Sequence, residues 1–515
     1  MKNNIYTCIE IGSYEIKILV CNLREERLFV LARNSIESAG VERGQIMNFD
    51  KLVNQIKKLK ESTEIDLKQS LRNVVLVIPP VDVVIEPVMG KINLDVNQPI
   101  RTDDVRKLFH QVMKLNHLET HVPVGIIPRV FRIDENHLVQ NPRGLAGMSL
   151  GIEAQRILLP STAISNLVHA VQTSGLKVED MILGSTAEVM LAINSPEMHA
   201  RTCQINIGHG VTTLTFVNDG KVIHTQSLPI GGIDVNREIA EKFNISEELA
   251  DELKVLYGKY NPHGKALPDY QIIHVYDTDE EVEEEEAEMK FITRGDLNDV
   301  ITDWCDQFFK IIGLHISDEL QLPEQEYNYS LSGGTAELPN ILYSLQEQLP
   351  LSATICQPSM LGVRDAKYSC LVGVTIYAHE LALLLGSNAN KRNLKFGLDN
   401  PEQTSSFRLD SEPDLITEVA KKPDSASVDL TDIFSDSVSS QSLRDAIAQM
   451  TAETSDSTEV TSEKPMKVFG EFDDIPGLDD ESSALDIDTS YMEKKLENSG
   501  MLGRFFEKIF TEDEG

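Results

Sequence analysis

The sequence is poor in cysteine, with six residues in 515 and no Cys-x-x-Cys pair among them. Cysteines at that spacing are typical of structural zinc sites and thiol redox motifs, so neither kind of site is indicated. Most of the cysteines lie in apolar runs that read as strands or helices, and we interpret them as reduced core residues. They are Cys8, Cys21, Cys203, Cys305, Cys356 and Cys370.

Positive charge is also scarce, because 47 Lys and Arg stand against 82 Asp and Glu, and the formal net charge is -35. Nucleic-acid binding needs Lys and Arg to contact phosphates, so we expect no nucleic-acid partner. An acidic surface is also repelled by anionic lipid. Any membrane contact must therefore be local and apolar.

Long uninterrupted apolar runs are missing as well. Glu10 and Lys17 interrupt the apolar stretch at the N-terminus, which is not the pattern of a signal peptide. The nearest candidate for a membrane span, Tyr368–Leu385, contains His379 and Glu380 and is better interpreted as a buried domain helix. These patterns predict a cytoplasmic protein.

Apolar strand-like runs alternate with amphipathic helical stretches as far as about Gly386. The strands Asn73–Ile78 and Cys203–Val217 are rich in Val, Ile and Leu, as strands covered on both faces should be. Helical patterns lie between the strands, for example at Ser161–Ser174 and Leu297–Glu319. This alternation predicts an α/β chain.

An almost purely acidic tract runs from Asp277 to Glu288, between strand-like pieces at Tyr270–Tyr276 and Met289–Thr293. We interpret it as the solvated tip of a hairpin, with a metal or partner site as the alternative.

The composition changes after about residue 386. Ser, Asp, Glu, Thr and Pro dominate residues 387–490, which cannot bury enough apolar surface to offset their ordering entropy. We therefore predict an acidic disordered linker. Val468 and Phe469, with Phe472, are either a docking peptide or chance apolar residues in that linker.

Residues 491–515 regain a pattern, since six apolar residues fall at helical spacing on one face. The alternatives are packing on the globular body, docking in a partner groove, or insertion into the surface of a membrane. Phenylalanine pairs flanked by cations favour insertion at the lipid headgroup boundary. The apolar residues are Met501, Leu502, Phe505, Phe506, Ile509 and Phe510, and the cations are Arg504 and Lys508.

Glycine-rich turns occur at four places, three of them directly after a strand-like run. Glycine in a tight turn lets backbone N–H groups approach phosphate, and paired glycines allow close contact with a flat ligand. Each turn alone is better explained as an ordinary hairpin or loop. Together they indicate a nucleotide site made by Gly12, Ser13, Tyr14 and Lys17; by Gly208, His209, Gly210, Val211 and Thr212; by Gly231 and Gly232; and by Gly333, Gly334 and Thr335.

The order of these segments resembles the actin, Hsp70 and sugar-kinase superfamily, in which two similar domains clamp ATP. Within it the chain resembles the FtsA family of bacterial cell-division proteins, on the run Ile127–Asp134 followed by Asn141–Gly147. Ala250–Lys254 is similar to a family helix, and the resemblance implies that Asp251 and Lys254 lie near the nucleoside.

The resemblance implies a two-lobed actin-like ATPase fold, built from ribonuclease H-like duplicated domains with an FtsA-type inserted subdomain. The expected boundaries are 1–83 and 162–190 for the first lobe, with 360–386 returning to it, and 84–161 for the insertion. The second lobe is expected at 191–359, with a smaller subdomain at about 243–330. The disordered linker 387–490 and the amphipathic membrane helix 491–515 would follow.

Three positions depart from the pattern of active ATPases. Relatives that hydrolyse ATP carry Asp in both phosphate turns to hold Mg²⁺, directly or through water, where this chain has Glu10 and Asn206. The usual Gln or Glu that orients water has no clear equivalent, although Glu188 is near the expected place. We expect ATP and Mg²⁺ to bind, with Glu10, Asn206 and Glu188 as weak catalytic candidates and with slow or no hydrolysis.

The resemblance further implies self-assembly, contact with cytoplasmic membrane lipids at the division septum, and recruitment of other division proteins. It also implies binding of the C-terminal peptide of the tubulin-like protein FtsZ, for which Arg294 is the candidate residue. Three alternatives stay open: an active kinase or chaperone ATPase of the same fold, the actin-like scaffold of a pilus or secretion assembly system, and an MreB-type filament.

Overall fold

The computed structural model describes residues 5–24, 27–95, 98–115, 120–134, 137–193, 201–218, 221–262, 269–276, 289–319, 327–349 and 352–386. Several features named from the sequence lie outside these residues: the acidic tract 277–288, the linker 387–490 with its apolar cluster at 468–472, and the tail 491–515 with all eight membrane residues. Their interpretation remains a prediction.

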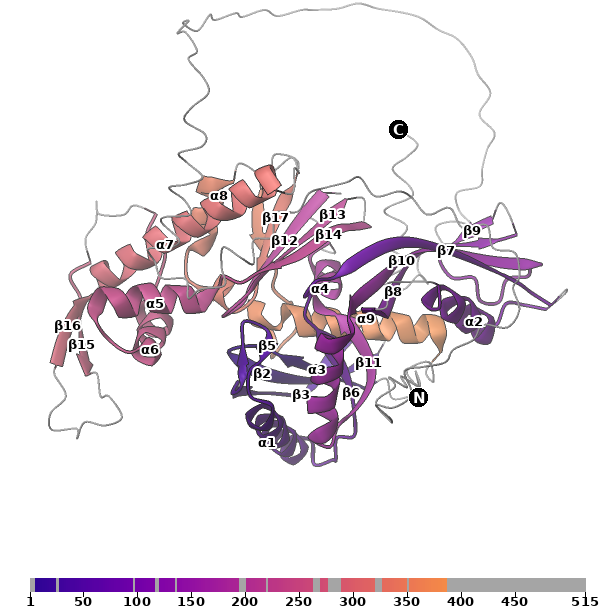
Figure 1. Cartoon of the computed structure of the whole chain (residues 1–515), viewed down its shortest axis with the longest axis horizontal. Coiled ribbons are helices and arrows are strands. Elements are labelled where there is room, and N and C mark those ends of the chain that lie inside the picture. The colour runs from indigo at the N-terminus through magenta and orange to yellow at the C-terminus, as the bar shows by residue number, and fades with distance from the viewer. Residues whose placement is uncertain are drawn as a thin grey trace, which may run out of the picture. The chain divides into compact units, whose positions relative to one another are not determined.

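The first lobe is built on a five-stranded sheet in the order β11-β6-β1-β2-β3 (Figure 1). The strands β1, β2 and β3 form an antiparallel meander, and β6 and β11 continue the sheet in parallel. Helices α1, α3 and α9 pack against it. The bounds are β1 Ile5–Ile11, β2 Glu15–Arg24, β3 Arg27–Glu37, β6 Asn73–Ile78, β11 Lys177–Leu183, α1 Phe49–Leu67, α3 Ser161–Thr173 and α9 Ser369–Leu385.

The second lobe repeats this arrangement in the order β14-β13-β12-β17-β18. Three strands again form an antiparallel meander, and two parallel strands complete the sheet. The same strand order occurring twice is the two-lobed actin-like fold that the sequence predicts. The bounds are β12 Arg201–Ile207, β13 Thr212–Asn218, β14 Lys221–Leu228, β17 Asn328–Ser332 and β18 Ala353–Ile355, with α4 at Gly184–Ile193, η5 at Thr335–Glu337 and α8 at Ile341–Gln348.

A separate four-stranded sheet, β7-β10-β8-β9, lies between β6 and β11 in the chain. Buried Arg156 on β10 ties this sheet together, because its guanidinium pairs with Glu86 on β7 and donates to the carbonyl of Leu115, which follows α2. The bounds are β7 Val84–Asn93, α2 Thr102–Met113, β8 His121–Ile133, β9 His137–Val139 and β10 Ser149–Pro160.

A further group of elements lies between β14 and β17 in the chain, and its helices α5, α6 and α7 lie together in Figure 1. Its last helix begins at Arg294, earlier than the predicted Leu297, because the Thr293 hydroxyl caps the helix by accepting from the backbone N–H of Asp296 at 3.0 Å. The bounds are α5 Gly232–Phe243, α6 Glu247–Tyr257, β15 Ile272–Tyr276, β16 Met289–Thr293, α7 Arg294–Leu314 and the π-helical turn η3 His315–Glu319.

Helix α9, with the turn η6 (Ala366–Tyr368) before it, is long and apolar enough to cross a membrane, but 83% of that segment is buried inside the protein. Its polar groups are paired there. Thr375 hydrogen-bonds Cys8 on β1 at 3.3 Å, and His379 hydrogen-bonds Tyr6 at 3.1 Å. The helix therefore packs as a core element of the first lobe, as the sequence predicts.

Candidate functional site

The two lobes carry matching glycine turns. Between β1 and β2 the N–H of Gly12 donates to the carbonyl of Glu15 at 3.1 Å, and between β12 and β13 the N–H of Gly208 donates to the carbonyl of Val211 at 2.9 Å. A Cβ added to Gly12 or to Gly208 would lie 2.9 or 2.8 Å from that same carbonyl oxygen. Both turns thus require glycine at their first position. We call them the first and second phosphate turns.

The other predicted glycine segments pack onto the second phosphate turn. The N–H of Gly232 and the hydroxyl of Thr335 both donate to the carbonyl of Gly208, at 3.0 and 3.1 Å. A Cβ on Gly231 would lie 2.5 Å from that oxygen, and one on Gly333 would lie 2.5 Å from the carbonyl oxygen of Ile207. Three segments that are distant in the sequence therefore form one continuous backbone surface, which we call the glycine cradle.

The first phosphate turn reaches this cradle through Tyr14. Its hydroxyl donates to Asp251 on α6 at 2.9 Å, and its ring centroid lies 5.0 Å from that of His209 in the second turn. Burial, with the nearby Asp251 carboxylate, raises the pKa of Tyr14 to about 12, so the phenol stays protonated and donates. The side chains of the two turns are thus in direct contact.

Asp251 and Lys254 form a small network on α6. The Lys254 ammonium lies 2.8 Å from Asp251 and donates to the side chain of Asn236 at 2.6 Å and to the carbonyl of Gly232 at 3.2 Å. Burial alone would raise the pKa of Asp251, but Lys254, Asn236 and Tyr14 lower it overall. The network ties α6 to the cradle. Asn236 was not identified from the sequence, because its role depends on its position on α5.

The histidine in the second phosphate turn is neutral. Burial, with the nearby Lys254 cation, lowers the pKa of His209 to about 4. Because the imidazole carries no charge at neutral pH, His209 does not add to the positive potential that phosphates would meet.

Lys17 is almost fully buried at the base of the first phosphate turn. Its ammonium lies 3.2 Å from Glu10 and donates to the carbonyl of Lys367 at 2.8 Å. Lys367 in turn pairs with Glu15 at 2.8 Å. The charge of Lys17 is therefore partly balanced by the protein itself.

Glu188 on α4 and Asn206 on β12 meet between the lobes' sheets. The Asn206 amide donates to Glu188 at 2.8 Å, and burial raises the pKa of the Glu188 carboxyl to about 7, with a contribution from nearby Glu10. Within the described ranges, one buried carboxyl oxygen of Glu10 and one of Glu188 have no hydrogen-bond partner. The three weak catalytic candidates, Glu10, Asn206 and Glu188, thus lie close together. Among the described residues, no group of three or more His, Cys, Asp or Glu side chains could hold a metal ion.

One residue that the sequence did not indicate also contacts the site. Arg43, in the turn between β4 (Val41–Glu42) and β5 (Gln45–Ile46), pairs with Asp234 in the first turn of α5 at 2.8 Å. The only available signal was an Arg-Gly pair between two short polar segments, which is too common to indicate a site.

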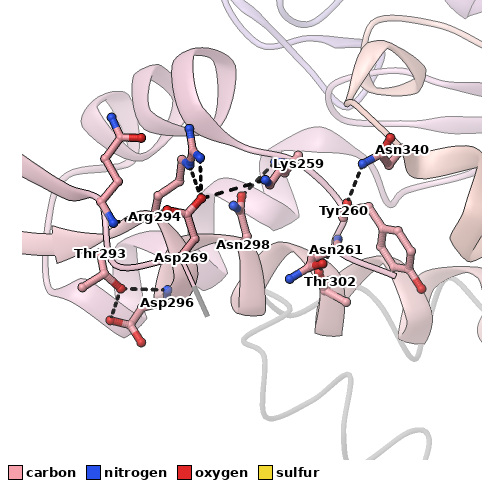
Figure 2. A network of polar contacts seen from close by, with 11 residues as sticks. Lys259, Tyr260, Asn261, Asp269, Thr293, Arg294, Asp296, Asn298, Thr302 and Asn340 are labelled. Atoms are coloured by element: carbon pink, nitrogen blue, oxygen red, sulfur yellow. Dashed lines mark hydrogen bonds and ion pairs between the residues drawn. The ribbon is translucent and has the colours of Figure 1, made fainter. Parts of the chain in front are cut away.

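Arg294, the candidate partner residue, lies at the start of α7 and is already paired (Figure 2). Its Nε donates to Asp269 at 2.6 Å, its terminal nitrogen contacts the same carboxylate, and Lys259 lies 3.9 Å from it. The Arg294 hydrogen bond holds the pKa of Asp269 below its ordinary value. Any acidic peptide that binds Arg294 would therefore compete with Asp269.

Comparisons with known proteins identify two parts of the chain. Residues 203–373 match the family model "Cell division protein FtsA", and residues 82–158 match "SHS2 domain inserted in FTSA". The cell division protein FtsA of Bacillus subtilis (strain 168) is 24% identical over 413 residues, which is 78% of this chain and 88% of that protein. That of Streptococcus pneumoniae (strain D39) is 25% identical over 381 residues, 74% of this chain and 81% of that protein.

Solved structures that resemble the chain are more distant in sequence. A chain of the PilM-PilN type IV pilus biogenesis complex is 14% identical to this chain, with a TM-score of 0.48. The match covers 72% of this chain and 98% of the pilus protein. MreB5 of Spiroplasma citri bound to AMPPNP is 12% identical, with 75% and 100% covered and a TM-score of 0.44. The duplicated sheet, the inserted four-stranded sheet and the relatives that match across both lobes agree with one another. Over residues 82–158 and 203–373 the chain matches the FtsA family, and the comparisons with the fold support an actin-like cell-division protein.

Proposed function

We propose that the glycine cradle binds ATP with Mg²⁺, and that the nucleotide-bound protein assembles on the cytoplasmic membrane and holds the division ring there. The observation that carries the nucleotide site is the identical Gly N–H to carbonyl bond in the two phosphate turns. Turns of this kind offer backbone N–H groups to anionic oxygens without adding side-chain bulk.

The residues present fit a nucleotide. The two phosphate turns would hold the phosphates, and Gly333, Gly334 and Thr335 would lie against the nucleoside together with Asp251 and Lys254. Gly334 supports this placement, since no atom of the described residues, its two chain neighbours aside, lies within 4 Å of a Cβ added there. The surface beside Gly334 is therefore open to a flat ligand.

The residues also fit a magnesium ion held partly through water. The buried oxygen of Glu10 that has no partner in the described chain is a hard anionic ligand, which Mg²⁺ prefers. Bound Mg²⁺ would neutralise phosphate charge. Asn206 is an amide and cannot act as a base, and the Glu188 carboxyl already accepts the Asn206 amide at 2.8 Å, so it is not free to orient water. We therefore expect weak or absent ATPase activity.

The tail would supply the membrane contact. Burying Phe505, Phe506 and the neighbouring apolar residues only in part contributes on the order of several kcal/mol, which supports reversible attachment of one subunit. Self-assembly would present many tails at once and make attachment firm by multivalency. The protein would then anchor the FtsZ ring through the C-terminal peptide of FtsZ at the septum and help to recruit other division proteins.

Liposome co-sedimentation tests this proposal. The full chain and a chain ending at Ser490 are spun with vesicles of phosphatidylglycerol and phosphatidylethanolamine, with and without ATP and Mg²⁺. We expect the full chain to pellet, more completely with ATP, and the shortened chain to stay in the supernatant. F505D in the full chain should behave as the shortened chain does. Equal pelleting of the full and shortened chains would contradict the membrane role.

A further inference from the structure

The turn between β4 and β5 has an unusual residue at its tip. Arg43 and Gly44 both have positive φ, +43° and +78°. Two-residue hairpins of this kind favour Asn or Asp followed by Gly, because those residues tolerate the left-handed region. An arginine there costs about 1 kcal/mol by comparison, which directs attention to what its side chain does.

This turn contacts both phosphate turns. The N–H of Gly44 donates to the hydroxyl of Ser13 in the first phosphate turn at 3.0 Å. Gly210 of the second phosphate turn packs against the backbone of Arg43, since a Cβ there would lie 3.1 Å from the Arg43 Cα. The β4–β5 turn therefore bridges the two halves of the proposed phosphate site.

The Arg43 side chain extends the bridge to α5. Its guanidinium pairs with one oxygen of Asp234 at 2.8 Å, and the other oxygen of Asp234 accepts the N–H of Gly231 at 2.8 Å. The Arg43 and Asp234 side chains are 27% and 15% exposed, so the pair is only partly screened by solvent. Arg237 lies 3.7 Å from the same carboxylate and would still balance Asp234 if Arg43 were removed.

We propose that the β4–β5 turn is a strap across the glycine cradle and that Arg43 is the positioning residue that fastens it. The inference rests on the proposed nucleotide site and adds a residue that controls how long nucleotide stays there. The strap links both phosphate turns to Asp234 and Gly231. Moving the two phosphate turns apart to release nucleotide therefore requires separation of the Arg43–Asp234 pair. Loss of that pair should speed nucleotide release.

The test measures release of radiolabelled ADP, chased with excess unlabelled ADP in the presence of Mg²⁺, from the full chain. R43N is the informative variant, because asparagine suits the left-handed position and is too short to carry a cation to Asp234. We expect R43N to release ADP about tenfold faster, since truncating one partner of a partly buried charge pair acts mainly on the dissociation rate. R43K, which keeps the charge, should fall between R43N and the unmodified chain.

The matched control is R33Q. Arg33 lies on β3 of the same lobe in a pair with Asp365 at 3.8 Å whose side chains are 45% and 53% exposed, and its removal should leave release unchanged. The thermal midpoint of R43N should be equal to or above that of the unmodified chain. A purely structural role of Arg43 would instead lower the midpoint. High salt should reduce the difference in release rate.

The results distinguish this inference from the proposed function. If the unmodified chain retains ADP and R43N releases it at the same rate, the strap is wrong and the nucleotide site stands. If the unmodified chain does not retain ADP, both are wrong.

Discussion

Tyr14 in the first lobe donates a hydrogen bond to Asp251 in the second, across 237 residues of sequence and a distance of 2.9 Å. Asp251 also accepts a hydrogen bond from the Asn236 amide and forms an ion pair with Lys254. The Tyr14 phenol therefore joins a network that already connects α5 and α6. A contact of this kind makes the position of the first phosphate turn depend on the second lobe. The turn and α6 should therefore respond together to any change at either one.

Tyr14→Phe tests this coupling. The ring remains beside His209, but the hydrogen bond to a charged acceptor is lost, which should cost about 1 kcal/mol at this partly exposed position. Backbone amides of α6 should then exchange with deuterium about fivefold faster. Y343F, at an exposed tyrosine on α8, serves as the control. Unchanged exchange in α6 would show that the phenol does not restrain the helix.

Two adjacent glycines should respond in opposite ways to alanine. Gly333 has a φ of +87°, and an added Cβ would lie 2.5 Å from the Ile207 carbonyl, so G333A should destabilise the fold by about 2 kcal/mol. At Gly334 an added Cβ has no atom within 4 Å in the described part of the chain, apart from the neighbouring residues, so G334A should keep the thermal midpoint.

The nucleotide distinguishes the two variants further. If the nucleoside lies against Gly334, the extra methyl group of G334A should weaken ATP binding about tenfold in a calorimetric titration. A stable G334A protein with unchanged ATP affinity would place the nucleoside elsewhere. G333A would serve as the comparison in which stability and ATP binding fall together.

The Arg294–Asp269 pair predicts how the protein should treat an acidic peptide. D269N leaves Arg294 without its main anionic partner, so a synthetic FtsZ C-terminal peptide should bind about threefold more tightly if Arg294 contacts it. R294Q should weaken binding, measured by fluorescence anisotropy. K310Q, on the exposed face of the same helix, is the matched control. Equal affinities for D269N and the unmodified chain would remove Arg294 from the peptide site.

Local sequence patterns predicted the parts of the fold that depend on neighbouring residues. The strand Asn73–Ile78 has the predicted bounds, because its run of Val, Leu and Ile is typical of a buried parallel strand. The turn glycines at 12, 208 and 333 were identified for the same reason, since each follows a strand directly. Local chemistry sufficed in these cases.

Contacts that depend on the assembled lobes were beyond prediction. Arg43 lies between strands of two residues each, which carry no hydrophobic period, and its partner Asp234 is 191 residues away. The bond from Asn206 to Glu188 was missed because it depends on how α4 lies against β12. Which residues form these pairs is determined only when the helices and sheets pack together.

The buried carboxyl of Glu188 should make stability depend on pH in a defined direction. Burial raises its pKa from 4.5 to about 7, so between these values the folded protein keeps a proton that the unfolded chain has lost. The contribution of Glu188 to the free energy of unfolding is fully present below pH 4.5 and is lost as the pH rises through about 7.

Glu188→Gln removes this titration and keeps an oxygen that accepts the Asn206 amide. Its urea midpoint should therefore exceed that of the unmodified chain increasingly from pH 5 to pH 7 and by a constant amount above that, with a stability difference on the order of 3 kcal/mol at the plateau. E61Q, at an exposed glutamate on α1, should show a difference that does not change over this range. If the E188Q difference is also constant with pH, the Glu188 carboxyl ionises as an ordinary exposed group does. Its burial beside Asn206 would then impose no penalty on the charged form, and the argument for a protonated group at the base of the phosphate turns would fail.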